Sequence, residues 1–182
     1  MKNVKSINPV LFCGFIFCIL NFTLFTSCKV EYKFQDITIP DSIRTVKINF
    51  IENHGQYINP QFSPQLTDRL KQKIVNQTRL NQTNLDEKAD WIIDGEVTEY
   101  YQSTSGITSS NGKSQTSINR LNVTVKITKR EPNKDPKDYI VTRQYDFGAN
   151  QSLQTAEARL MDEMVRNLVD EIFNSLFSGW SE

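Results

Sequence analysis

Alternation of apolar and polar residues along the chain predicts four β-strands. Residues 46–50 and 121–128 alternate at nearly every position, which is typical of strands with one buried face. Residues 91–101 interleave the two kinds of residue in the same way, and residues 139–147 follow a charged turn as a fourth strand. Because the third and fourth strands are close neighbours in sequence, we expect them to form an antiparallel hairpin.

A helix is predicted to begin at Ser63 and to end near Thr78. Ser63 has the side chain of an N-cap, and Pro64 then occupies the first helical position, where its missing N–H has no consequence. The apolar positions expected on its buried face are Leu66, Leu70 and Ile74, with Val75 as a further candidate. Their spacing of four places them on one stripe, which predicts an amphipathic helix.

Residues 155–177 carry the clearest helical pattern in the chain. Apolar residues recur there in pairs at intervals of four, and charged residues occupy the other face. The apolar positions are Leu160, Met161, Met164, Val165, Leu168, Val169, Ile172, Phe173, Leu176, Phe177. Ser152 or Thr155 is the expected cap at the start of this helix, and Gly179 is expected to end it.

The predicted order of elements is β-α-β-β-β-α, which indicates the fold class. We expect an α+β two-layer sandwich, with a four-stranded, mostly antiparallel sheet and both helices on one face. The other face would then be open to water or to a partner. Four aromatic residues could supply contacts there, although about half of them are expected in the core: Trp91, Tyr100, Tyr101, Tyr145.

A long polar segment, residues 102–119, separates the second and third predicted strands. It is dominated by Ser, Thr, Gly, Asn and Gln, and we expect it to form a loop. Loops of this length are usually functional or disordered.

The N-terminus predicts a lipoprotein precursor. Lys2 and Lys5 precede an apolar run that is too short to span a membrane, and small residues then lead to Cys28. The stretch 24–28 resembles a bacterial lipobox, with Phe25 where Leu is usual. Cys28 is therefore the expected lipidation site. The alternative is an uncleaved anchor helix over residues 10–25, which leaves the position of the cysteine unexplained.

These features divide the chain into a signal peptide (1–27), a lipid-anchored tether (28–42) and a globular domain (43–182). The signal peptide removes two of the 21 basic residues and none of the 21 acidic ones, so the mature chain carries a charge of about −2. Such a charge argues against non-specific nucleic-acid binding. Cys13 and Cys18 leave with the signal peptide, and lipidation consumes Cys28, so no disulfide is expected.

The residues offer little catalytic chemistry. His54 is the only histidine, and it lies in a Gly/Asn loop with no nucleophile motif beside it. No His/Cys cluster has the spacing of a zinc site, and an acylated Cys28 cannot be a nucleophile. We therefore expect no enzymatic activity, no metal site and no cofactor.

Basic residues around the predicted hairpin form the one weak candidate for ligand contact. They are Lys126, Lys129, Arg130, Lys134, with Lys137 nearby. Such groups could bind phosphate by charge-assisted hydrogen bonds. Interspersed acidic residues (Glu131, Asp135, Asp138) favour instead a solvated turn of mixed charge.

The segments in their order resemble the lipopolysaccharide-assembly lipoprotein family, LptE. The residues that carry the resemblance are 45–50, 58–60, 63–70, 89–97, 119–125 and 168–174, behind the lipobox. The resemblance implies a two-layer domain anchored to the outer membrane on its periplasmic side. It also implies a partner, the large β-barrel LptD, whose lumen the lipoprotein plugs, and contact with lipopolysaccharide through basic residues.

A second interpretation is a surface or periplasmic lipoprotein that binds a glycan or another protein through its open sheet face. A third, less favoured one is a lipid-anchored hydrolase. Recovery of a barrel partner from solubilised outer membrane would distinguish the LptE-type function from both of these alternatives.

Overall fold

The computed structural model describes residues 39–110 and 113–177, with the side chains of residues 105–117 excepted. The predicted signal peptide, Cys28 and residues 178–182 lie outside these ranges. The described residues form an α+β fold with two helices and a mixed sheet of six strands, which confirms the predicted class. Neither of the two helices is both long and apolar enough to cross a membrane.

Three long strands lie side by side from one edge of the sheet, and three short strands lie beyond the innermost of them. The bounds are β1 Thr45–Ile48, β2 Glu52–Asn53, β3 Asn81–Gln82, β4 Trp91–Ser110, β5 Lys113–Arg130 and β6 Lys137–Gly148. The order is β3-β1-β4-β5-β6, and β2 pairs with β4 beyond the end of β1. The pairs β4–β5 and β5–β6 are antiparallel, whereas β1 runs parallel to β3 and β4. The predicted hairpin is confirmed.

The sheet has two more strands than expected because β2 and β3 are only two residues long. Alternation needs at least four residues to be recognised in a sequence. Here tertiary pairing creates the strands: β2 is aligned by β4, with Glu52 opposite Glu96, and β3 is aligned by β1, with Thr45 opposite Asn81.

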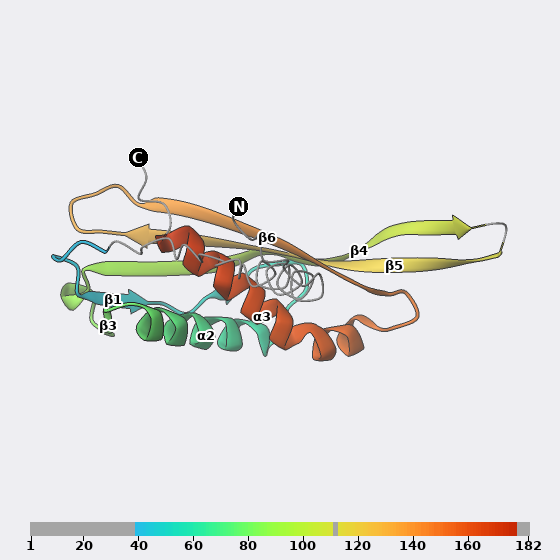
Figure 1. The fold of residues 1–182 in the computed structure, drawn as a ribbon, viewed down its shortest axis with the longest axis horizontal. Helices are drawn as coiled ribbons and strands as arrows, with labels where there is room; N and C mark the ends of the chain where they lie inside the picture. The colour runs from blue at the N-terminus through green and yellow to red at the C-terminus, as the bar shows by residue number, and fades with distance from the viewer. Residues whose placement is uncertain (1–38, 111–112, 178–182) are drawn as a thin grey trace, which may run out of the picture. The chain divides into compact units, whose positions relative to one another are not determined.

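The prediction of a loop over residues 102–119 was wrong. Both strands continue through this segment, with Thr104 opposite Asn119, Ile107 opposite Ser117 and Ser110 opposite Lys113. Strand β6 ends at Gly148 opposite Ile118, so the outer part of the β4–β5 hairpin is a two-stranded ribbon (Figure 1). Backbone hydrogen bonds hold such a ribbon whatever its polarity, and a ribbon without a core beneath it leaves no apolar period in the sequence.

The two helices begin slightly earlier than the sequence indicated. Helix α2 spans Phe62–Gln77 and helix α3 spans Leu153–Phe177, and a short 3-10 turn, η2, covers Asp86–Lys88. Gln61 is the N-cap of α2 and makes no side-chain cap hydrogen bond, so Ser63 is not the cap. The start of α2 is set instead by Asn59, whose side-chain oxygen accepts the N–H of Gln61 at 2.9 Å.

Ser152 is confirmed as the cap of α3. Its Oγ accepts the N–H of Thr155 at 3.2 Å, and it also contacts the Thr155 hydroxyl at 2.8 Å. This bond satisfies one of the free N–H groups in the first helical turn.

Both helices cover the same face of the sheet, side by side (Figure 1). Their apolar stripes meet the alternating apolar positions of β4, β5 and β6, and this contact forms the core. Two ion pairs join the helices at the surface, Arg69 with Asp162 at 2.5 Å and Lys73 with Asp170 at 2.7 Å.

The aromatic residues considered for the open face lie mostly in the core. Trp91 and Tyr100 are fully buried, Tyr145 is nearly so, and only Tyr101 is half-exposed. Burial raises the pKa of Tyr145 to about 12. Ile39, at the end of the predicted tether, is also buried, and its carbonyl accepts a hydrogen bond from the Arg79 guanidinium.

Asp90 joins the start of β4 to the start of β1. Its carboxylate accepts the backbone N–H groups of Arg44 at 2.8 Å and Thr45 at 2.9 Å. The bond from Arg44 contributes most to lowering the pKa of Asp90 below its ordinary value, and it outweighs the opposing effect of burial. A lowered pKa in the folded state stabilises the fold above the unfolded pKa, and this stabilisation is lost as the pH falls through the folded pKa.

We therefore expect Asp90→Asn to lower the free energy of unfolding by about 1 kcal/mol at pH 7. The loss should shrink as the pH falls below about 4, because the wild-type carboxylate then becomes protonated too. Urea unfolding at several pH values measures both effects. Asp68→Asn, on the exposed face of α2, is the matched control. An equal loss for Asp90→Asn at neutral and acidic pH would contradict the assignment.

Candidate functional site

The sheet face opposite the helices is a polar surface in which most side chains are paired across strands. Asp94 is central to one end of it: it accepts hydrogen bonds from Asn49 Nδ2 and from Arg130 Nε, both at 2.7 Å. Burial alone would raise the pKa of Asp94, but the bonds from Arg130 and Asn49 outweigh it and hold this pKa below its usual value. Asp94 is therefore an ionised group held by Asn49, just beyond β1, and by Arg130, at the end of β5.

A second group of ionic contacts lies beside Asp94. Lys126 Nζ is 3.2 Å from Asp138 Oδ2 and 3.9 Å from Glu96 Oε1. Thr128 Oγ1 donates to Asp138 at 2.6 Å, and this bond is the largest cause of the lowered pKa of Asp138. A depression of about 230 Å³ opens here, lined by Asp94, Gly95, Glu96, Lys126, Thr128.

The rest of the open face combines hydroxyl groups with paired charged side chains. Thr124 is central: its Oγ1 donates to Glu99 at 2.7 Å and lies 3.1 Å from the Thr142 hydroxyl. At the edge, Arg120 donates two hydrogen bonds to Asp146, at 2.6 and 3.0 Å. Ile140 on the edge strand β6 adds an apolar side chain to this face and is 71% exposed. The face thus offers a pre-ordered array of donors and acceptors, such as those found in wet polar interfaces.

The structure does not gather the four basic residues of the predicted contact into one patch. The alternation of β5 puts Lys126 and Arg130 on the open face, but it puts Lys129 on the face that meets the helices. Lys129 is only 3% exposed; its ammonium lies 4.3 Å from the centre of the Trp91 ring and 3.2 Å from Glu131. Burial lowers the pKa of Lys129.

Lys134, the fourth basic residue, lies in the turn between β5 and β6. Its Nζ is 2.6 Å from Glu131 Oε2, so Glu131 is held between Lys129 and Lys134. Although burial opposes it, these two cations lower the pKa of Glu131. Each of the four candidates thus contacts a carboxylate, and an anionic ligand would have to compete with it.

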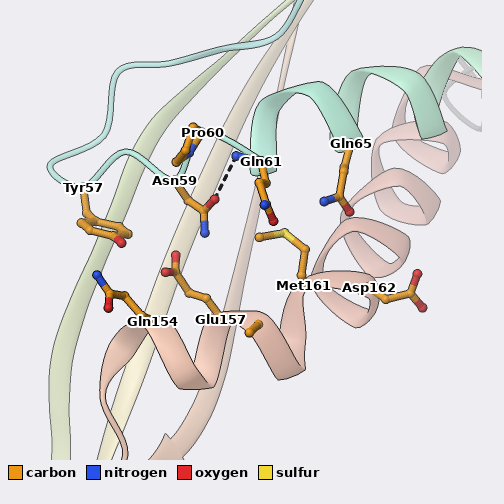
Figure 2. Close-up of a pocket in the computed structure, with 10 residues that line it drawn as sticks. Tyr57, Asn59, Pro60, Gln61, Gln65, Gln154, Glu157, Met161 and Asp162 are labelled. Carbon is orange, nitrogen blue, oxygen red and sulfur yellow. Dashed lines mark hydrogen bonds between the residues drawn. The ribbon is translucent and has the colours of Figure 1, made fainter.

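A larger cavity, of about 500 Å³, lies on the other side of the molecule (Figure 2). Its walls come from the loop before α2, the first turns of α2 and the first turns of α3, and it contains the carboxylate of Glu157. Sequence reasoning did not select this residue. A signal exists, however, since Glu157 stands three and four positions before Leu160 and Met161, which places an acidic residue within the buried stripe of α3.

His54 lies in an exposed loop, as the sequence indicates. Its nearest ionic neighbour is Glu52, 3.3 Å from Nε2. Across the part of the chain that the structure describes, no group of His, Cys, Asp and Glu residues could hold a metal ion.

Comparisons with known proteins relate the chain to one family. A family model described as "LptE: Lipopolysaccharide-assembly" matches residues 43–176. No curated protein matches by sequence.

Several solved structures are similar to this chain at low sequence identity. A structure from Helicobacter pylori, described as a neuraminyllactose-binding hemagglutinin homolog, has a TM-score of 0.52 and 11% identity, with 80% of this chain and 91% of that chain covered. Lipoprotein B from Nitrosomonas europaea gives 0.47 and 17%, covering 75% of this chain and 83% of that one. The rare lipoprotein B from Shewanella oneidensis gives 0.43 and 14%, covering 74% and 95%. At 11% identity, the match to the Helicobacter pylori structure shows the fold alone.

Proposed function

The chain belongs to the lipopolysaccharide-assembly family LptE, and from this premise we propose that it is an outer-membrane lipoprotein that plugs an LptD-type β-barrel. In this role it assists assembly of the barrel and the delivery of lipopolysaccharide to the cell surface. The family match over residues 43–176 is the observation that carries the proposal, because it covers both helices and all of the described strands.

The open face of the sheet supports this role. A plug inside a barrel meets a lumen that is polar, and its surface must offer hydrogen bonds rather than a large apolar patch. The open face has this character, because Asp94, Lys126 and Thr124 are each held by cross-strand partners. Such a face can be covered without the burial of unpaired charges.

The anchor would be the lipid on Cys28, on the periplasmic side of the outer membrane. A multiply acylated cysteine holds a protein firmly at a membrane, whereas a single chain binds only marginally. The short segment from Cys28 to Ile39 would then connect the anchor to the folded domain, which keeps that domain close to the membrane surface.

Contact with lipopolysaccharide would involve the basic residues of the open face. Lys126 and Arg130 both lie there, and phosphate groups could replace Asp138 and Asp94 as their partners. Lys129 and Lys134 would act at most indirectly, through Glu131, because Lys129 is buried.

Depletion of the protein from its native bacterium tests the proposal. We expect lipopolysaccharide to disappear from the cell surface and to accumulate inside the envelope, and a plasmid copy of the wild-type chain to restore it. A copy with Cys28→Ala should restore transport poorly, because the domain is then released from the membrane.

The alternative is a lipoprotein that binds a glycan or another protein through the same polar face. That protein would be dispensable for lipopolysaccharide transport. Normal surface lipopolysaccharide in depleted cells would therefore exclude the barrel plug and favour the alternative.

A further inference from the structure

The 500 Å³ cavity beside α3 is built around one buried acidic side chain. Glu157 is 2% exposed, and its carboxylate points between Tyr57, Asn59 and Gln154 (Figure 2). One of its oxygens accepts the hydroxyl proton of Tyr100, which lies beneath it on β4 and is fully buried. Desolvation and the nearby Glu157 both raise the pKa of Tyr100, so this phenol remains a donor.

Glu157 has no cationic partner among the side chains that the structure describes. Lys, Arg and His residues form ion pairs with other carboxylates along the helices and the sheet, but none of these pairs includes Glu157. Its neighbours in the cavity are a phenol and amides. A carboxylate removed from water without a countercharge is costly, and natural proteins rarely retain one unless it has a partner or a function.

The walls of the cavity fit a cation that carries a hydrocarbon stem. The Tyr57 ring stacks near Tyr100, with 5.9 Å between centroids, and Pro60 and Met161 add apolar surface. Gln61 and Gln154 place amide groups around the opening, where they can accept hydrogen bonds from N–H donors. The volume lies within the range of small-ligand sites, and an aromatic face beside a cation adds further attraction.

We propose that this cavity binds an ammonium or guanidinium group on a short hydrocarbon stem, with the Glu157 carboxylate as its ionic partner. This chemistry is shared by small free amines and by the Lys or Arg side chains of a protein. The site lies between the loop before α2 and the start of α3, and it does not depend on the proposed barrel partner.

Ligand-observed NMR titration of the mature lipoprotein in detergent tests the proposal. The probes are putrescine for the free amine, N-acetyl-arginine amide and N-acetyl-lysine amide for the protein side chain, and N-acetyl-citrulline amide as the neutral isostere. We expect saturable binding of at least one cation with a Kd of about 1 mM or below, and at least tenfold weaker binding of the citrulline derivative. The cation that binds tighter identifies the source.

Two variants assign the binding to this cavity. Glu157→Gln keeps an oxygen for the Tyr100 hydroxyl but removes the charge, and we expect it to weaken binding at least tenfold while its melting temperature stays near that of the wild type. Glu163→Gln, an exposed residue on the same helix, is the matched control and should bind like the wild type. Ala158→Phe fills the cavity from an exposed position, so it should abolish binding without unfolding the protein.

The proposal is overturned if no cation binds saturably up to about 10 mM, well above the expected Kd. It is overturned equally if citrulline binds as well as arginine, or if Ala158→Phe retains full affinity. The last comparison decides the matter even if Glu157→Gln does not fold.

Discussion

Trp91→Ala is expected to lower the free energy of unfolding by about 3–5 kcal/mol, the largest single loss in the chain. Trp91 is fully buried at the start of β4, where its backbone pairs with Val46 of β1. Its ring lies 5.9 Å from the Phe177 ring, and the Lys129 ammonium lies over it at 4.3 Å. Alanine would leave a cavity between the sheet and the end of α3, and it would also remove the aromatic face beside a buried cation.

Urea unfolding followed by circular dichroism measures this loss. Trp91→Phe is the informative comparison, because it keeps an aromatic ring and removes an indole N–H that is buried without a protein partner. We expect it to cost less than about 1.5 kcal/mol. Val75→Ala, at a 41% exposed position of α2, should change stability by no more than about 0.5 kcal/mol. Equal losses for Trp91→Ala and Val75→Ala would contradict the packing described above.

Gly55→Ala should cost about 3 kcal/mol, although it adds a single methyl group. A Cβ at this position would lie 2.5 Å from the Tyr100 nitrogen and 2.6 Å from its Cβ. The loop cannot move away cheaply, because His54 N–H bonds to Val97 O and Tyr57 N–H bonds to Tyr100 O, both at 2.9 Å. The added methyl group must therefore break at least one of these bonds or shift β4.

Gly148→Ala is the matched control for Gly55→Ala. Its Cβ would meet Asn150 Oδ1 at 2.6 Å, but that atom is the end of an exposed side chain and can rotate away. We expect a change below about 1 kcal/mol by thermal or urea unfolding. If the two glycine variants lose the same stability, the close approach of the loop to β4 is not what requires glycine at position 55.

The sequence predicted the parts of the fold in which local pattern and tertiary burial agree. The stripe of α3 and the alternation in the second half of β5 each repeat over many residues. The start of α3 was therefore placed within two residues, and β5 was recognised from Leu121 to Thr128, although the strand begins earlier, at Lys113. Elements that depend on a distant partner were missed. Strand β3 exists because β1 lies beside it, and the ribbon beyond Thr104 exists because two polar strands pair through their backbones.

The functional surfaces were predicted less well than the fold, for a related reason. Proximity in sequence suggested one basic cluster, yet the period of two in β5 sends Lys126 and Lys129 to opposite faces of the sheet. The alternation of side chains in the predicted strand would have separated Lys126 from Lys129 without the structure. The position of Glu157 within the buried stripe of α3 can be seen in the sequence, but its cavity cannot. The cavity is completed by Tyr57 and Asn59, about a hundred residues earlier in the chain.

Membership of the LptE family and the polar open face lead to one physical picture. The helices and the apolar sheet face stabilise the domain, while the opposite face presents side chains whose charges are already paired, as at Asp94 and Lys126. A surface of this kind can enter a polar lumen with little reorganisation, because its groups are ordered before the partner arrives.

Affinity purification of the tagged protein from gently solubilised outer membrane tests the proposed function most directly. We expect one large β-barrel protein of the LptD type to be recovered with it in stoichiometric amount. Recovery of the protein alone, or with soluble partners only, while its lipid anchor is intact, would contradict the proposed role as a barrel plug.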